Sequence, residues 1–112
     1  MIEYPYCDVI DIYNPKTCLA YRYAKKMNQK DFAELIHINS CMLSSYETGC
    51  VIGAESRRHI QNSLSEMFAT DFVDHKLVIQ LVARLIYLSE RNDQRLYELL
   101  FEVTHEYIIT SS

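Results

Sequence analysis

The stretch from Gln29 to Gly49, QKDFAELIHINSCMLSSYETG, constrains the fold of this chain more than any other part of it. Its apolar residues follow the spacing of two helical faces. The first face consists of Phe32, Ala33 and Ile36, and the second consists of Ile38, Leu43 and Tyr46. Helices of this length are unstable alone, so they must pack against each other and against further elements. The stretch therefore predicts two short helices joined by a tight turn.

The second of these helices is expected from about Ser40 to Tyr46. Small polar side chains lie outside its packed face, namely Ser40, Cys41, Ser44 and Ser45. Such a face suits a helix that lies against another surface.

The same stretch resembles the helix-turn-helix of the XRE family, the group of phage Cro and lambda-type repressors. The residues in register with that family's pattern are Gln29, Phe32, Ala33, Ile38, Leu43, Ser44, Glu47 and Gly49. Two positions depart from it: His37 stands where the turn usually has Gly, and Asn39 where Ser or Thr usually caps the second helix. Asn is a good N-cap, and His is enriched at positive φ among non-glycine residues.

The resemblance implies an all-α, lambda-repressor-like domain of about four to five helices that binds double-stranded DNA. It implies that the second helix enters the major groove, with Asn39, Ser40, Cys41, Ser44 and Ser45 facing base edges. Asn can bind adenine through two hydrogen bonds, and Ser can bind several bases. No Arg lies on this surface, so sequence preference is expected to depend on few bases or on DNA shape.

Residues expected to contact DNA phosphates are Gln29, Lys25, Lys26, Lys30, Arg57 and Arg58. The loop from Cys50 to Ala54 is apolar, whereas many relatives have basic or polar residues there. The resemblance also implies that Arg22 of the preceding helix pairs with Glu47, and we interpret this ion pair as structural rather than catalytic.

The charge distribution agrees with a nucleic-acid partner although the net charge is −4. Residues 14–59 hold seven basic and four acidic residues, a balance of +3. Residues 1–13 hold three acidic residues and no basic one, and the remainder of the chain is also acidic. The positive charge therefore surrounds the two-helix stretch.

Three segments are expected along the 112 residues: an N-terminal arm over 1–13, an XRE-type domain over 14–70 and a C-terminal helical hairpin over 71–112. The arm has three interpretations, which are an ordered arm covering the core with its tyrosines, a strand pairing with a second subunit, or a frayed terminus. Asn14 and Pro15 predict the start of a first helix that runs to about Lys26. A further helix is expected from Ala54 to Phe68.

The helix expected from Asp74 to Leu88 is apolar around most of its circumference, so it should be buried on more than one side. A final helix, capped by Ser89 or Asn92, should follow it. In so small a protein we expect this hairpin to form a twofold homodimer. The interface residues would be Leu77, Val78, Leu81, Val82, Leu85, Leu88, Leu96, Leu100 and Val103.

Motifs for catalysis are missing from the sequence: it has no Gly-rich phosphate loop, no nucleophile elbow and no His-Glu-x-x-His helix. We therefore expect no enzymatic activity, no cofactor and no metal. The cysteines form no Cys-x-x-Cys pair and follow no signal peptide, which indicates reduced thiols in a cytoplasmic protein without a membrane partner.

Two alternatives to a DNA-binding regulator remain open. One is a protein-interaction module, such as an antitoxin or a phage-encoded inhibitor, that binds a protein through the hairpin or the loop at Val51 and Ile52. The other is a regulator gated by a ligand or by redox state, with the C-terminal half as sensor. A separate hypothesis is that Cys41 on the second helix, or Cys50 just beyond it, senses oxidation.

Overall fold

The computed structural model describes residues 9–71, 74–89 and 93–111, and within these ranges the chain is all-helical. Six helices follow one another, and the described residues contain no strand. They are α1 (Pro15–Ala24), α2 (Gln29–Leu35), α3 (Ser40–Glu47), α4 (Ala54–Asp71), α5 (His75–Leu88) and α6 (Gln94–Ser111). The all-α prediction is therefore confirmed for this part of the chain.

Short polar residues define where most of these helices begin. A side-chain oxygen accepts a hydrogen bond from the first helical turn at Asn14, Asn28, Asn39, Asp74 and Asp93. Each cap satisfies a backbone N–H that has no partner within its helix. The prediction that Ser89 or Asn92 caps the final helix is wrong, because Asp93 accepts from the N–H groups of Arg95 and Leu96; Asn92 lies outside the described residues.

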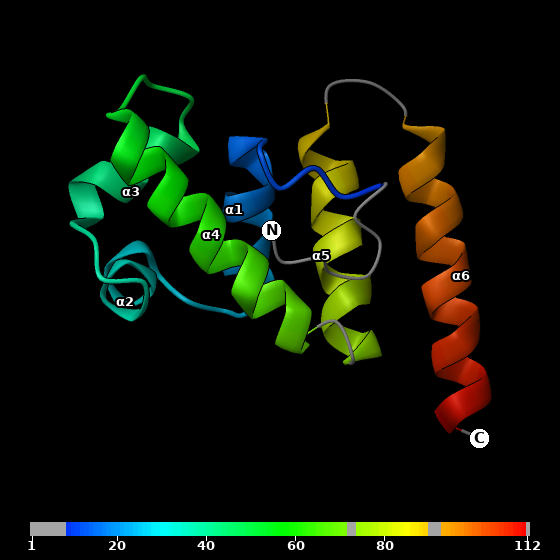
Figure 1. Ribbon diagram of the computed structural model, residues 1–112. Helices are drawn as coiled ribbons and strands as arrows, with labels where there is room; N and C mark the ends of the chain where they lie inside the picture. The colour runs from blue at the N-terminus through cyan, green and yellow to red at the C-terminus, as the bar shows by residue number, and fades with distance from the viewer. Residues whose placement is uncertain (1–8, 72–73, 90–92, 112) are drawn as a thin grey trace.

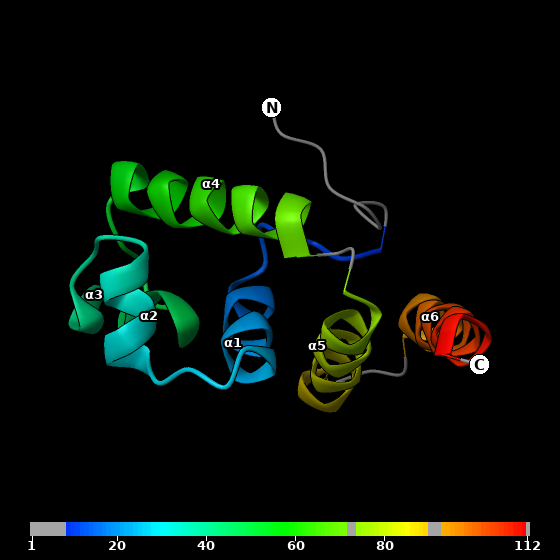
Figure 2. The ribbon, with the colours of Figure 1, turned by 90° about the horizontal axis from the view of Figure 1, so that it is seen from below.

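Helix α1 occupies the centre of the molecule (Figures 1 and 2). Helices α2, α3 and α4 surround one side of it, α5 packs on the other side, and α6 lies along the outer side of α5. Tyr21 of α1 is fully buried in the core between these helices. Its ring lies 6.2 Å from that of Phe32 and 4.6 Å from that of Phe68, measured between centroids.

The end of the N-terminal arm belongs to this core. Ile10 and Ile12 are 1% and 8% exposed, whereas Tyr13 is 62% exposed. The Thr17 hydroxyl donates a hydrogen bond to the carbonyl oxygen of Asp11, which ties the arm to α1. Isoleucines rather than tyrosines therefore cover the core here, and no strand forms between residues 9 and 13; residues 1–8 lie outside the described residues.

The hydrophobic residues of α5 and α6 are buried within one chain. Val78, Leu81, Val82 and Val103 are 0% exposed, and Leu85 and Leu96 are at most 9% exposed. These side chains fill the space between α1, α5 and α6, so a second chain cannot contact them in this arrangement. The apolar circumference of α5 results from packing against two helices of its own chain. Of the predicted interface residues, Leu77, Leu88 and Leu100 keep a partly exposed surface.

The same core cluster includes residues from both sides of the predicted boundary at residue 70. Ile60 and Phe68 of α4 belong to it together with Leu81 of α5 and Leu99 of α6. Residues 14–71 and the hairpin therefore share one hydrophobic core.

Replacing Leu81 with Ala should lower the free energy of unfolding by about 2–5 kcal/mol, because it removes a fully buried side chain and leaves a cavity. The matched control is Leu35→Ala, since Leu35 is 49% exposed, and it should change stability by less than about 1 kcal/mol. Denaturant unfolding measures both. Equal losses in the two variants would contradict the burial of Leu81.

Candidate nucleic-acid interface

Helices α2 and α3 form a two-helix unit joined by the turn from Ile36 to Asn39. His37 adopts φ +62°, the left-handed conformation that the turn requires. The N–H of Ile38 donates to the carbonyl of Ala33 at 2.9 Å, which closes the turn. Past the end of α3, Gly49 has φ +85°, and the N–H of Cys50 donates to the carbonyl of Ser45. The chain thus leaves α3 through a left-handed glycine, as its sequence predicts.

The ion pair expected between Arg22 and Glu47 is present. Arg22 Nε lies 2.9 Å from Glu47 Oε2, and Arg22 Nη2 donates to Glu47 Oε1 at 3.0 Å. Burial opposes the charged guanidinium, but the hydrogen bonds to Glu47 and its charge outweigh that effect and raise the pKa of Arg22. This two-pronged pair joins α1 to α3, and both side chains are buried.

Two further residues complete the network around Glu47. Gln29 Nε2 donates to Glu47 Oε1 at 3.0 Å, and Cys18 Sγ lies 3.8 Å from Oε2. Burial and then the Glu47 charge raise the pKa of the Cys18 thiol, so this cysteine stays protonated. No local sequence pattern predicts these contacts, because Gln29 is 18 positions from Glu47 and Cys18 is 29 positions from it.

The outer face of α3 is available for contact. Ser40 and Cys41 are exposed, and Ser44 and Ser45 are partly exposed. Among the described residues, the hydroxyls of the three serines have no hydrogen-bond partner. The structure therefore brings the small polar residues together on one surface, with free donors and acceptors.

Asn39 has a different role from the other predicted base-contact residues. Its Oδ1 accepts a hydrogen bond from the N–H of Cys41 at 2.7 Å, so the side chain is the N-cap of α3. A two-bond contact with adenine needs both the oxygen and the nitrogen of the amide. While Asn39 caps α3, the expected adenine contact would require Oδ1 to accept a second hydrogen bond at the same time.

The residues predicted to contact phosphates fall into two groups. Lys26, Lys30, Arg57 and Arg58 are exposed. Lys25 pairs with Asp71 at 3.1 Å, which neutralises its charge beside the end of α4. Gln29 donates one N–H of its side-chain amide to Glu47 Oε1, and the second N–H of that nitrogen has no hydrogen-bond partner among the described residues. Arg57 and Arg58 lie on the first turns of α4, at the end of this helix that adjoins α3 (Figure 1).

The loop after α3 is the most exposed apolar segment of this region. Val51 is 97% exposed, while Ile52 packs partly against the core. Cys41 and Cys50 are free and exposed thiols. The described residues hold no group of three or more histidine, cysteine or acidic side chains placed to bind a metal ion.

No helix in the described ranges combines the length and the apolar character needed to span a lipid bilayer. Comparison of the chain with known protein families, with curated proteins and with solved structures yields no match.

Replacing Glu47 with Ala should lower the free energy of unfolding by about 3–5 kcal/mol, because it leaves the buried Arg22 guanidinium without its partner. The double variant Arg22→Met/Glu47→Leu removes both charges and should recover most of that loss. Thermal and denaturant unfolding give the values. A double variant no more stable than Glu47→Ala would show that the loss does not come from an unpaired buried charge.

Proposed function

We propose that this chain is a sequence-specific, double-stranded DNA-binding transcription regulator that acts as a homodimer and reads the major groove through α3. The observation that carries the proposal is the α2–α3 unit. The buried Arg22–Glu47 pair fixes α3, and the serines on its outer face keep their hydroxyls free. This arrangement supports the helix-turn-helix interpretation of the sequence.

Base contacts are proposed for Ser40, Cys41, Ser44 and Ser45, whose short side chains allow α3 to approach the base edges closely. The exposed cations Lys26, Lys30, Arg57 and Arg58 would supply phosphate contacts and long-range attraction. In a twofold dimer, the two copies of α3 would meet half-sites separated by one helical turn, ~34 Å, or by a multiple of it.

The dimer needs a surface other than the buried faces of α5 and α6. Tyr97, Phe101 and Ile108 are 44%, 73% and 61% exposed on α6. Their spacing of four and seven residues places them on one side of the helix. This outer stripe of α6 is the apolar surface that we assign to dimerisation. Because α3 and α6 lie at opposite ends of the molecule (Figures 1 and 2), the two half-sites would then be more than one helical turn apart.

A second candidate function is a protein-interaction module that keeps this fold. The specific observation in its favour is Val51, which is 97% exposed in an apolar loop beside α3. A protein partner could bury this loop, whereas DNA phosphates have no attraction to it.

Salt dependence distinguishes the two functions. Affinity for a random-sequence duplex, measured by fluorescence anisotropy, should fall about tenfold or more between 50 and 200 mM salt if several cations contact phosphates. Selection from a random duplex library should then enrich an inverted repeat. Absence of both binding and enrichment at low salt would contradict DNA binding and favour a protein partner.

Replacing Ser44 and Ser45 together with Ala should weaken binding to the selected site by about tenfold and relax its sequence preference, because the base-facing hydroxyls are lost. The melting temperature should stay within a few degrees of wild type, since neither hydroxyl bonds within the described structure. The matched control is Ser63→Ala/Thr70→Ala further along α4, where both hydroxyls bond to carbonyl groups of their own helix. Equal affinity of the two double variants would mean that α3 is not the reading helix.

A further inference from the structure

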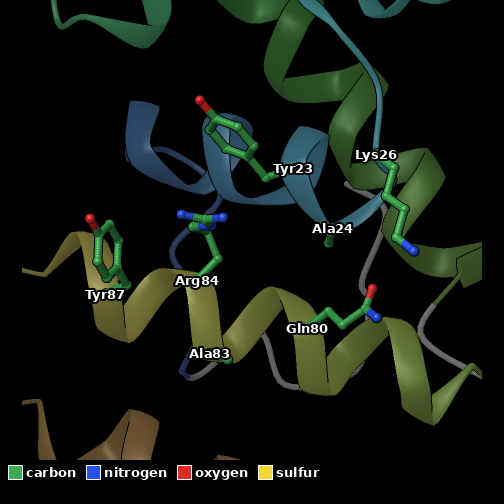
Figure 3. A pocket seen from close by; sticks show the side chains of 7 residues that line it. All are labelled: Tyr23, Ala24, Lys26, Gln80, Ala83, Arg84 and Tyr87. Atoms are coloured by element: carbon green, nitrogen blue, oxygen red, sulfur yellow. The ribbon is translucent and has the colours of Figure 1, made fainter.

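An open groove of about 440 Å³ runs between α1 and α5. It is lined by Tyr23, Ala24, Lys26, Gln80, Ala83, Arg84 and Tyr87. We call it the α1–α5 groove (Figure 3). Its lining has two cations, two phenol rings and an amide, but no carboxylate. The whole chain has a net charge of −4, but the lining of this groove is positively charged and contains no acidic residue.

Arg84 is the central residue of the groove. Its guanidinium carbon lies 4.6 Å from the ring centroid of Tyr23 and 5.3 Å from that of Tyr87. Figure 3 shows the guanidinium extending from α5 toward α1, between these two rings. Cation–π contacts on two sides limit the conformations of the side chain.

The aromatic contacts leave the hydrogen-bonding capacity of Arg84 unused. Among the described residues, its guanidinium has no hydrogen bond and no ion pair. An arginine presents five N–H donors in a planar fork that matches the oxygens of a phosphate. Arg84 is thus held in place with its donors free, which suits recognition of an oxyanion.

Lys26 is the second cation of the groove, and its backbone has an unusual left-handed conformation. It has φ +58°, a region where glycine is the preferred residue, just beyond the end of α1. Figure 3 shows its side chain directed toward Gln80 of α5. The chain therefore has a lysine at a position where glycine would relieve strain, and that lysine lines the groove.

We propose that the α1–α5 groove binds a phosphate group, with Arg84 as the residue that contacts it and Lys26 as the second cation. A phosphate monoester carries a charge between about −1.5 and −2 at neutral pH. Two cations therefore match the charge of a phosphate more closely than the single negative charge of a carboxylate. The phosphate can belong to a free phosphorylated molecule or to a DNA strand that reaches the groove past Lys26. The free-ligand arm of the test is independent of the proposed DNA-binding function.

The test follows the backbone amide signals of Tyr23, Gln80 and Ala83 by NMR, in the full chain, during titration with adenosine monophosphate and with inorganic phosphate. Binding should shift these signals, which are present in every variant below, with a dissociation constant of about 1 mM or tighter. Arg84→Gln should weaken binding about tenfold or more, since it removes a charge-assisted hydrogen-bond donor. Lys76→Gln is the matched control, because it removes one exposed charge from the same helix outside the groove.

The variant Lys26→Gly distinguishes a loss of phosphate binding from a loss of folding stability. It removes the cation and relieves the left-handed backbone, so the melting temperature should stay unchanged or rise while phosphate affinity falls. Arg84→Lys, which keeps the charge but loses the fork, should bind more weakly than wild type and more tightly than Arg84→Gln.

A second titration uses a random-sequence duplex with the same variants. Weaker duplex binding in Arg84→Gln than in Lys76→Gln, without any response to adenosine monophosphate, would assign the site to the DNA backbone. A response to adenosine monophosphate alone would assign it to a free ligand. If Arg84→Gln matches Lys76→Gln in both titrations, the proposal is overturned.

Discussion

The buried ion pair between Arg22 and Glu47 is the interaction on which the arrangement of the helices depends. Transferring two charged groups from water costs several kcal/mol per ion, and only close geometry with further hydrogen bonds offsets it. Here two direct hydrogen bonds join the side chains, Gln29 donates to the carboxylate, and Arg22 Nη1 donates to the carbonyl of Met27. One carboxylate thereby connects α1, the start of α2 and the end of α3.

This network has a consequence for the surface. Glu47 holds the last turn of α3 from inside, and the hydroxyls of Ser40, Ser44 and Ser45 make no hydrogen bond within the described residues. Short helices such as α2 and α3 have little stability of their own, so their orientation must come from such tertiary contacts. A rigid helix with a small polar outer face is the arrangement that the proposed function requires.

Local signals account for the parts of the fold that the sequence predicted well. A helix cap involves residues only a few positions apart, so it can be read from the sequence. The starts of α1 and α3 and the end of α3 could therefore be predicted closely from Asn14, Asn39 and Gly49. The left-handed His37 followed from the turn that the family resemblance implies. The Arg22–Glu47 pair also came from the resemblance, because nothing local connects positions 25 apart.

Long-range partners account for what the sequence could not supply. The pattern of α5 showed that the helix is buried on several sides, but it did not show which elements bury it. The structure assigns that role to α1 and α6 of the same chain, so Val78 and Leu81 are core residues. Lys25 appeared to be a free cation until the fold placed Asp71, 46 residues later, beside it. The α1–α5 groove lies between two helices that are distant in the sequence, and no sequence motif marks its lining residues.

Amide chemical-shift mapping with a short random-sequence duplex is the most direct test of DNA binding through α3, because it locates the contact surface without a known operator. The perturbed amides should cluster on α3, at the start of α2 and on the first turns of α4. Perturbation confined to the loop at Val51 or to the outer stripe of α6, or no perturbation at low salt, would contradict DNA binding through α3.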